Sequence, residues 1–108
     1  MHLTNNSKKL LYILYNEYIN RRNHNVPAKR AVHFDNAKSV HENFMPDEQL
    51  EDVESYMIEL ENNSFLDNFY ADGTIYYCDL TDFAICKMEE LPKNTLLSIA
   101  DFISKFIP

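Results

Sequence analysis

The chain has 108 residues, a hydrophobic content of 45% with seven Phe and seven Tyr, and a formal net charge of −7. This length suits one domain and is too short for two independent cores, and the hydrophobic content exceeds that of a disordered acidic chain. Because Gly73 is the one glycine and proline occurs four times, we expect helices to dominate. The absence of a long apolar run at the N-terminus predicts no signal peptide or membrane span, and hence a cytoplasmic protein.

Charge is distributed unevenly along the chain. Residues 1–33 hold six basic residues against the single acid Glu17, whereas residues 34–65 hold nine acids against Lys38. A basic segment can follow DNA phosphates if its helices present the cations on one side, although an ordinary solvated surface is the competing interpretation. The candidate DNA-binding residues are Lys8, Lys9, Arg21, Arg22, Lys29 and Arg30.

The N-terminal half is predicted to begin with a helix over residues 7–22, in which apolar residues recur at helical spacing. Pro27 suits the first position of a helix, so residues 28–34 are predicted to form a short second helix. Residues 35–44 fit a further helical turn and a loop equally well, because only Val40 and Phe44 have helical spacing.

A second strongly amphipathic helix is predicted over residues 47–61, since Pro46 and the acids after it are typical of a helix start. Its apolar stripe, with three- and four-residue spacing, consists of Leu50, Val53, Met57 and Leu60. Aromatic and β-branched residues then fill residues 65–70 and 74–78. These two stretches are separated by Ala71, Asp72 and Gly73, a segment that supplies the positive φ of a tight turn. We therefore predict a β-hairpin.

Two helices are expected after the hairpin. Thr81 is predicted to cap a helix over residues 81–91, and a last helix covers residues 95–107. The apolar residues of the last helix are too many for one stripe against so small a body, which predicts a homodimer through this helix. Phe102 and Phe106 are the candidate interface residues.

The segment from residue 47 to residue 91 resembles the winged-helix domains of bacterial regulators. The resemblance rests on a helix that ends in a Leu-centred turn at residues 58–66, a hairpin with Asp72 and Gly73 at its tip, and Leu80 and Thr81 opening the next helix. The chain is also similar to small prophage-associated YjcQ-like winged-helix proteins, which end in an added helix. The resemblance covers about half of the chain and is more specific for fold than for function.

The resemblance implies a mostly helical α+β fold, with residues 1–108 as a single winged helix-turn-helix domain that has a hairpin wing and an added C-terminal helix. It also implies a DNA-binding transcriptional regulator, in which residues 47–61 are the recognition helix. The chain departs from the pattern because Phe83 and Ala84 stand where a Gly is usual, and because the would-be recognition helix is acidic.

An acidic helix is repelled by DNA phosphates, so a second function stays open. Regularly placed carboxylates can bind a basic protein surface or imitate DNA phosphates, and complementary charge steers such complexes. The candidate protein-binding carboxylates are Asp47, Glu48, Glu51 and Asp52. The alternatives are therefore a regulator that binds DNA through its basic N-terminal third and an acidic protein-interaction module.

Catalysis, metal binding and cofactors are not expected. His33 and His41 are eight positions apart, and Cys78 and Cys86 lack both CxxC spacing and a nearby His, so we predict free, mostly buried thiols. The acids of residues 47–61 have no nucleophile or base motif beside them, which favours a solvated face over an acid–base site.

Overall fold

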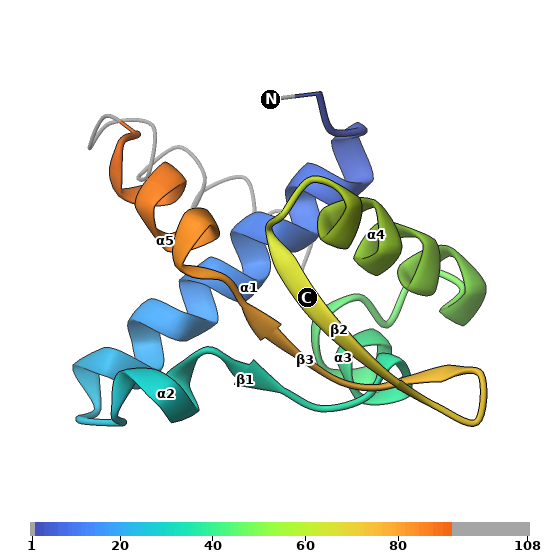
Figure 1. Cartoon of the computed structure of the whole chain (residues 1–108), viewed down its shortest axis with the longest axis horizontal. Coiled ribbons are helices and arrows are strands. Elements are labelled where there is room, and N and C mark those ends of the chain that lie inside the picture. The colour runs from blue at the N-terminus through green and yellow to red at the C-terminus, as the bar shows by residue number, and fades with distance from the viewer. Residues whose placement is uncertain (1, 92–108) are drawn as a thin grey trace.

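The computed structural model describes residues 2–91, which form five helices and three short strands. This arrangement confirms the predicted mostly helical α+β class (Figure 1). In chain order the elements are α1 (Asn5–Asn23), α2 (Ala28–Ala31), β1 (His33–Phe34), α3 (Ala37–Phe44), α4 (Leu50–Asn62), β2 (Leu66–Ala71), β3 (Thr74–Leu80) and α5 (Asp82–Glu89).

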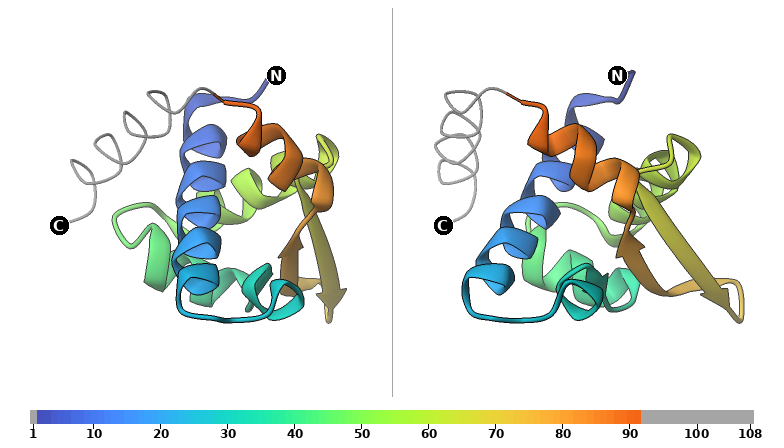
Figure 2. Two further views of the ribbon diagram at one scale, coloured as in Figure 1. Left: turned by 90° about the vertical axis from the view of Figure 1, so that its left-hand side faces the viewer. Right: turned by 60° about the vertical axis from the view of Figure 1, so that its left-hand side comes forward.

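The three strands form one antiparallel sheet in the order β1-β3-β2. The hairpin of β2 and β3 extends away from the body on the side where α4 lies (Figure 1). Helix α3 packs against β3 and α4 packs against β2. The helices α1, α3 and α4 lie on the same side of the strands, so the sheet has one covered face and one open face (Figure 2).

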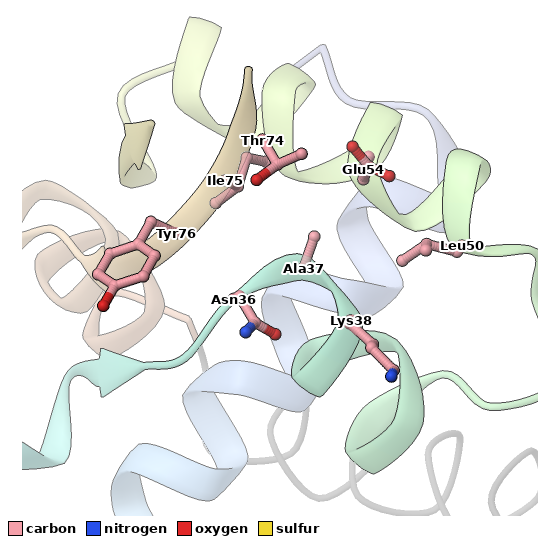
Figure 3. A pocket seen from close by; sticks show the side chains of 8 residues that line it. All are labelled: Asn36, Ala37, Lys38, Leu50, Glu54, Thr74, Ile75 and Tyr76. Atoms are coloured by element: carbon pink, nitrogen blue, oxygen red, sulfur yellow. The ribbon is translucent and has the colours of Figure 1, made fainter. Parts of the chain in front are cut away.

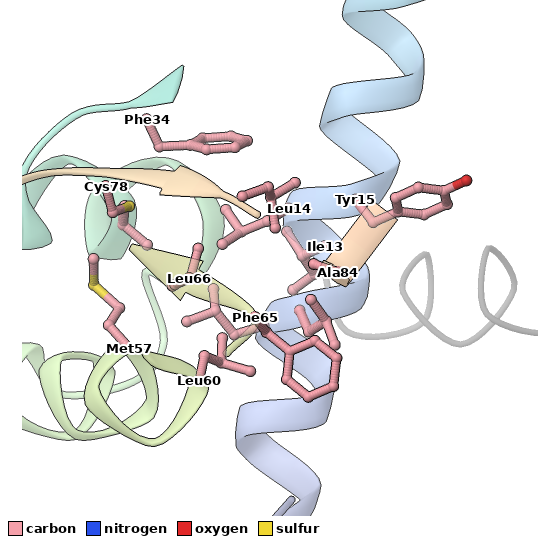
Figure 4. Packing of buried hydrophobic residues seen from close by; sticks show 14 of the residues in the cluster. Ile13, Leu14, Tyr15, Phe34, Met57, Leu60, Phe65, Leu66, Cys78 and Ala84 are labelled. Atoms are coloured by element: carbon pink, nitrogen blue, oxygen red, sulfur yellow. The ribbon is translucent and has the colours of Figure 1, made fainter. Parts of the chain in front are cut away.

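The core lies between α1, α3, α4 and the covered face of the sheet (Figure 4). Buried residues recur every three or four positions in α4, as an amphipathic helix requires. They alternate in the paired part of the hairpin, at Leu66 and Asn68 of β2 and at Cys78 and Leu80 of β3. A register shift between Phe69 and Tyr70 places the next buried residue of β3, Ile75, three positions before Cys78. The largest fully buried side chains include Leu10, Leu11, Leu14, Val53, Met57, Leu60, Leu66, Ile75, Cys78 and Met88.

The hairpin turn confirms the sequence prediction. Asp72 has φ of 53° and Gly73 has φ of 78°, and Ala71 pairs with Thr74 across them. Positive φ at both central residues is the property of the type I′ turn, whose twist suits the strands of a hairpin.

The start of α4 was predicted three residues too early. Residues 46–48 form a turn, Gln49 occupies the N-cap position, and the helix begins at Leu50. The side chain of Met45 is buried, and the imidazole Nε2 of His41 bonds the Glu48 carbonyl at 2.7 Å. These contacts with α3 hold the turn in a non-helical shape, so Asp47 and Glu48 precede the helix.

Residues 28–34 were predicted as one helix, and this is wrong in its second half. Helix α2 ends at Ala31, and β1 pairs His33 with Asp79 and Phe34 with Cys78 of β3. The ambiguous segment that follows is helical in α3, where the Asn36 side chain accepts a hydrogen bond from the Ser39 N–H at 2.8 Å.

Thr81 caps α5 as predicted, since its hydroxyl oxygen accepts a hydrogen bond from the Ala84 N–H at 3.0 Å. The helix ends at Glu89 instead of residue 91. Leu80, which was expected to open this helix, belongs to β3. The predicted helix over residues 95–107, with Phe102 and Phe106, lies outside the described residues. No helix within residues 2–91 is both long and apolar enough to cross a membrane.

Candidate interaction surface

Arg21, a candidate phosphate ligand, is held in contacts within the domain. Its Nε lies 3.2 Å from Glu17 Oε1, and its Nη1 donates to the His33 carbonyl at 2.7 Å and the Ala31 carbonyl at 3.3 Å. The guanidinium carbon lies 4.4 Å from the centre of the Phe34 ring. Arg21 therefore fastens the end of α1 to α2 and β1, which is a structural role.

The other basic candidates lie in two groups, one near the start of α1 and one where α1 meets α2. Lys8 and Lys9 are half-buried near the start of α1, roughly 18 Å along the helix axis from its last turn. Arg22, Lys29 and Arg30 are exposed where α1 meets α2, and Arg22 donates to the Val26 carbonyl at 3.1 Å. These two places lie near opposite ends of α1.

Three acids in and before α4 are also used inside the domain. Glu48 accepts a hydrogen bond from the Tyr56 hydroxyl at 2.9 Å, and Glu59 accepts one from the Thr4 N–H at 2.7 Å. Glu61 accepts the Tyr70 hydroxyl at 2.6 Å, and this hydrogen bond, more than burial, raises the pKa of Tyr70. These carboxylates position other groups and are not available in full to a partner.

The remaining acids point outward with two apolar side chains. Asp47, Glu51 and Asp52 are exposed, and Glu54 is half-buried. Leu50 and Ile58 are 37% and 41% exposed, although the spacing had placed Leu50 in the core stripe. We name the exposed side of the helix the α4 outer face; its residues are Leu50, Glu51, Glu54, Ser55, Ile58 and Asn62.

A cavity of about 210 Å³ adjoins the α4 outer face. It lies between the start of α3, the start of α4 and the start of β3 (Figure 3). Its lining residues are Asn36, Ala37, Lys38, Leu50, Glu54, Thr74, Ile75 and Tyr76. Its walls combine aliphatic and aromatic side chains with the Glu54 carboxylate and the Lys38 ammonium group, a lining typical of sites that bind an organic group.

The sequence predicted no metal or catalytic site at the thiols and imidazoles. Cys78 is buried, and desolvation raises its pKa to about 12, whereas Cys86 is exposed, contrary to the expectation of mostly buried thiols. His33 is exposed and its Nδ1 lies 2.8 Å from Asp79 Oδ1. Within residues 2–91, no group of three His, Cys, Asp or Glu side chains is arranged to hold a metal.

Sequence reasoning missed the apolar part of this surface and the cavity beside it. The i, i+4, i+8 spacing of Leu50, Glu54 and Ile58 was a usable signal for a shared helix face.

Comparison with family models, curated proteins and solved structures found no match for the chain. Assignment of function therefore depends on the chemistry of these surfaces.

Proposed function

We propose that the chain is a winged helix-turn-helix domain that uses its α4 outer face to bind a protein. The order α1, β1, α3, α4, β2, β3 and the central position of β3 in the sheet support this architecture. In it, α3 and α4 are the two helices of the helix-turn-helix, residues 45–49 are the turn, and the hairpin is the wing.

The observation that carries the function is the composition of the α4 outer face. In the place of a recognition helix it presents Leu50 and Ile58 beside Glu51 and Glu54, and α4 contains no Lys or Arg. Carboxylates at these positions repel a phosphate backbone, and the helix lacks the cations that commonly read guanine. Apolar anchors with charged neighbours are instead typical of a protein interface.

The partner is expected to be a basic protein surface with an apolar side chain at its centre. That side chain enters the cavity between α3, α4 and β3, where Leu50, Ile75 and Tyr76 supply apolar walls. Lys or Arg residues around it pair with Glu51 and Asp52 at the rim. Because the rim pairs stay partly solvated, they set the association rate and specificity more than the affinity.

DNA binding remains a second proposal, favoured by the exposure of Arg22, Lys29 and Arg30 at the junction of α1 and α2. This junction and α4 lie toward opposite ends of the molecule (Figure 1). A duplex held there would contact cations through its phosphates, without α4 in its groove.

A salt series with a fluorescent duplex of random sequence separates the two proposals. The protein-binding proposal predicts no duplex binding at ~50 mM salt, and a gain of salt-sensitive binding in the double variant Glu51→Lys/Glu54→Lys. Duplex binding by the unmodified chain, lost steeply with salt and abolished by Lys29→Gln/Arg30→Gln, would overturn it in favour of DNA.

A further inference from the structure

The open face of the sheet carries a second group of exposed side chains. Helices α3 and α4 pack on the other face, where Leu66, Asn68 and Cys78 are buried. Successive strand residues point to opposite faces, so the exposed Asp67 and Phe69 of β2 point to the open side. The same alternation directs Tyr77 and Asp79 of β3 and His33 of β1 to that side.

The strand register arranges these side chains in two rows. Asp79 lies between Asp67 and His33 in one row, and Tyr77 lies opposite Phe69 in the next. The Phe69 and Tyr77 rings are stacked with centroids 4.4 Å apart and planes 17° apart, and the His33 ring is 5.2 Å from Tyr77. We name these five residues the sheet-face patch.

The patch contains an unfavourable pairing. Asp67 and Asp79 are directly opposite each other on neighbouring strands, and like charges at such positions destabilise a sheet. His33 is hydrogen-bonded to Asp79, but within residues 2–91 neither carboxylate is paired with a Lys or Arg. Phe69 beside them is 43% exposed, which leaves an apolar ring in water.

A cation bound at the patch relieves both unfavourable features, the carboxylate repulsion and the exposed aromatic ring. It neutralises the repulsion between Asp67 and Asp79, and it covers the ring of Phe69 through a cation–π contact. Phosphate is excluded by the same two carboxylates, so stacking of nucleic-acid bases on the rings is disfavoured.

We propose that the sheet-face patch binds an arginine side chain of a basic protein segment. A guanidinium group is flat and stacks on an aromatic ring while its fork of N–H donors pairs with carboxylates, which a compact ammonium group cannot do. The aromatic row is two residues along the strands from the row of carboxylates. An arginine that lies across Phe69 therefore reaches Asp67 and Asp79. The net charge of −7 steers a basic segment toward the domain.

This surface is separate from the α4 outer face, because α4 lies on the covered side of the sheet. The two sites can be occupied together, and either can fail without the other. A matched control lies outside both surfaces, since Glu42→Gln on α3 removes one exposed negative charge, as Asp67→Asn does in the patch.

Binding of fluorescent hexa-arginine and hexa-lysine peptides to the whole chain tests the proposal. We expect tighter binding of hexa-arginine, a loss of roughly fivefold in Asp67→Asn, and a loss of roughly threefold in Phe69→Leu with a reduced preference for arginine. Glu42→Gln should change the affinity by less than about twofold. Thermal unfolding provides a fold control, because Asp67→Asn relieves the like-charge pair and should not lower the melting temperature.

Three results would overturn the proposal. Equal losses in Asp67→Asn and Glu42→Gln mean diffuse attraction by the net charge. A loss confined to Glu51→Gln places the peptide on the α4 outer face. Equal affinity for the two peptides, unchanged by Phe69→Leu, means that the aromatic row takes no part.

Discussion

Thr4 and Glu59 are 55 positions apart, yet three hydrogen bonds between them join the N-terminus of α1 to α4. The Thr4 N–H donates to Glu59 Oε2 at 2.7 Å and its hydroxyl donates to Oε1 at 3.0 Å. A carboxylate at a helix N-terminus also interacts favourably with the helix dipole. An acid that looks from sequence like part of a binding face is therefore a structural residue.

Replacing this acid tests the assignment. Glu59→Ala should lower the free energy of unfolding by about 1–2 kcal/mol, since it leaves the first turn of α1 without its acceptor. Glu51→Ala, an exposed acid of the same helix, is the matched control and should change stability by less than about 0.5 kcal/mol. Urea denaturation measures both variants, and equal values for the two would show that Glu59 has no special role.

Substitutions of Arg21 and Arg30 should likewise differ in their effect on the stability of the domain. Arg21→Gln removes the bonds to the Ala31 and His33 carbonyls and the contact with Phe34, so we expect a loss of about 2 kcal/mol. Arg30→Gln alters an exposed side chain and should leave stability nearly unchanged. Thermal unfolding followed by circular dichroism compares them; a stable Arg21→Gln protein would return Arg21 to the candidate DNA ligands.

The hairpin turn gives a prediction about the backbone alone. A Cβ at Gly73 would meet no atom within 4 Å, but φ of 78° is strained for a branched residue. Gly73→Val should therefore cost more than about 1 kcal/mol, whereas Asp72→Asn, which also tolerates positive φ, should be nearly neutral. An unchanged melting temperature for Gly73→Val would contradict a type I′ turn.

Local chemistry made part of this fold predictable from sequence. The turn at Asp72 and Gly73 and the cap at Thr81 depend on neighbouring residues and were predicted correctly. Strand β1 has two residues and exists only through pairing with β3, so residues 33 and 34 carried no local strand signal. The false helix start at Asp47 has the same cause, because contacts with α3 override the local preference there.

The candidate surfaces were less predictable than the elements that form them. The acidic character of α4 was evident, but only the three-dimensional contacts separate Glu59, which caps α1, from Glu51, which faces outward. The opposition of Asp67 and Asp79 depends on strand register, which residue types alone did not determine. Spacing likewise assigned Leu50 to the core, whereas the start of α4 leaves it beside a cavity.

The two cysteines should react at very different rates. Burial raises the pKa of Cys78 to about 12, so its thiolate is negligible between pH 7 and about pH 9, whereas Cys86 is exposed. Iodoacetamide should label Cys86 alone in the folded protein at pH 8 and both cysteines in denaturant. Peptide mass spectrometry locates the label, and rapid labelling of Cys78 in the folded state would contradict the packing of β3.

The central claim is that the α4 outer face meets a protein, and site-specific photocrosslinking in the producing cell tests it most directly. A photoreactive benzophenone residue at Ile58, which is 41% exposed, should yield an adduct with a protein. The same residue at exposed Asn20 of α1 is the control and should not give that adduct. Adding Glu51→Lys and Glu54→Lys should remove the adduct, because the basic partner is then repelled. An adduct with DNA at position 58, or a protein adduct that survives both charge reversals, would contradict the account.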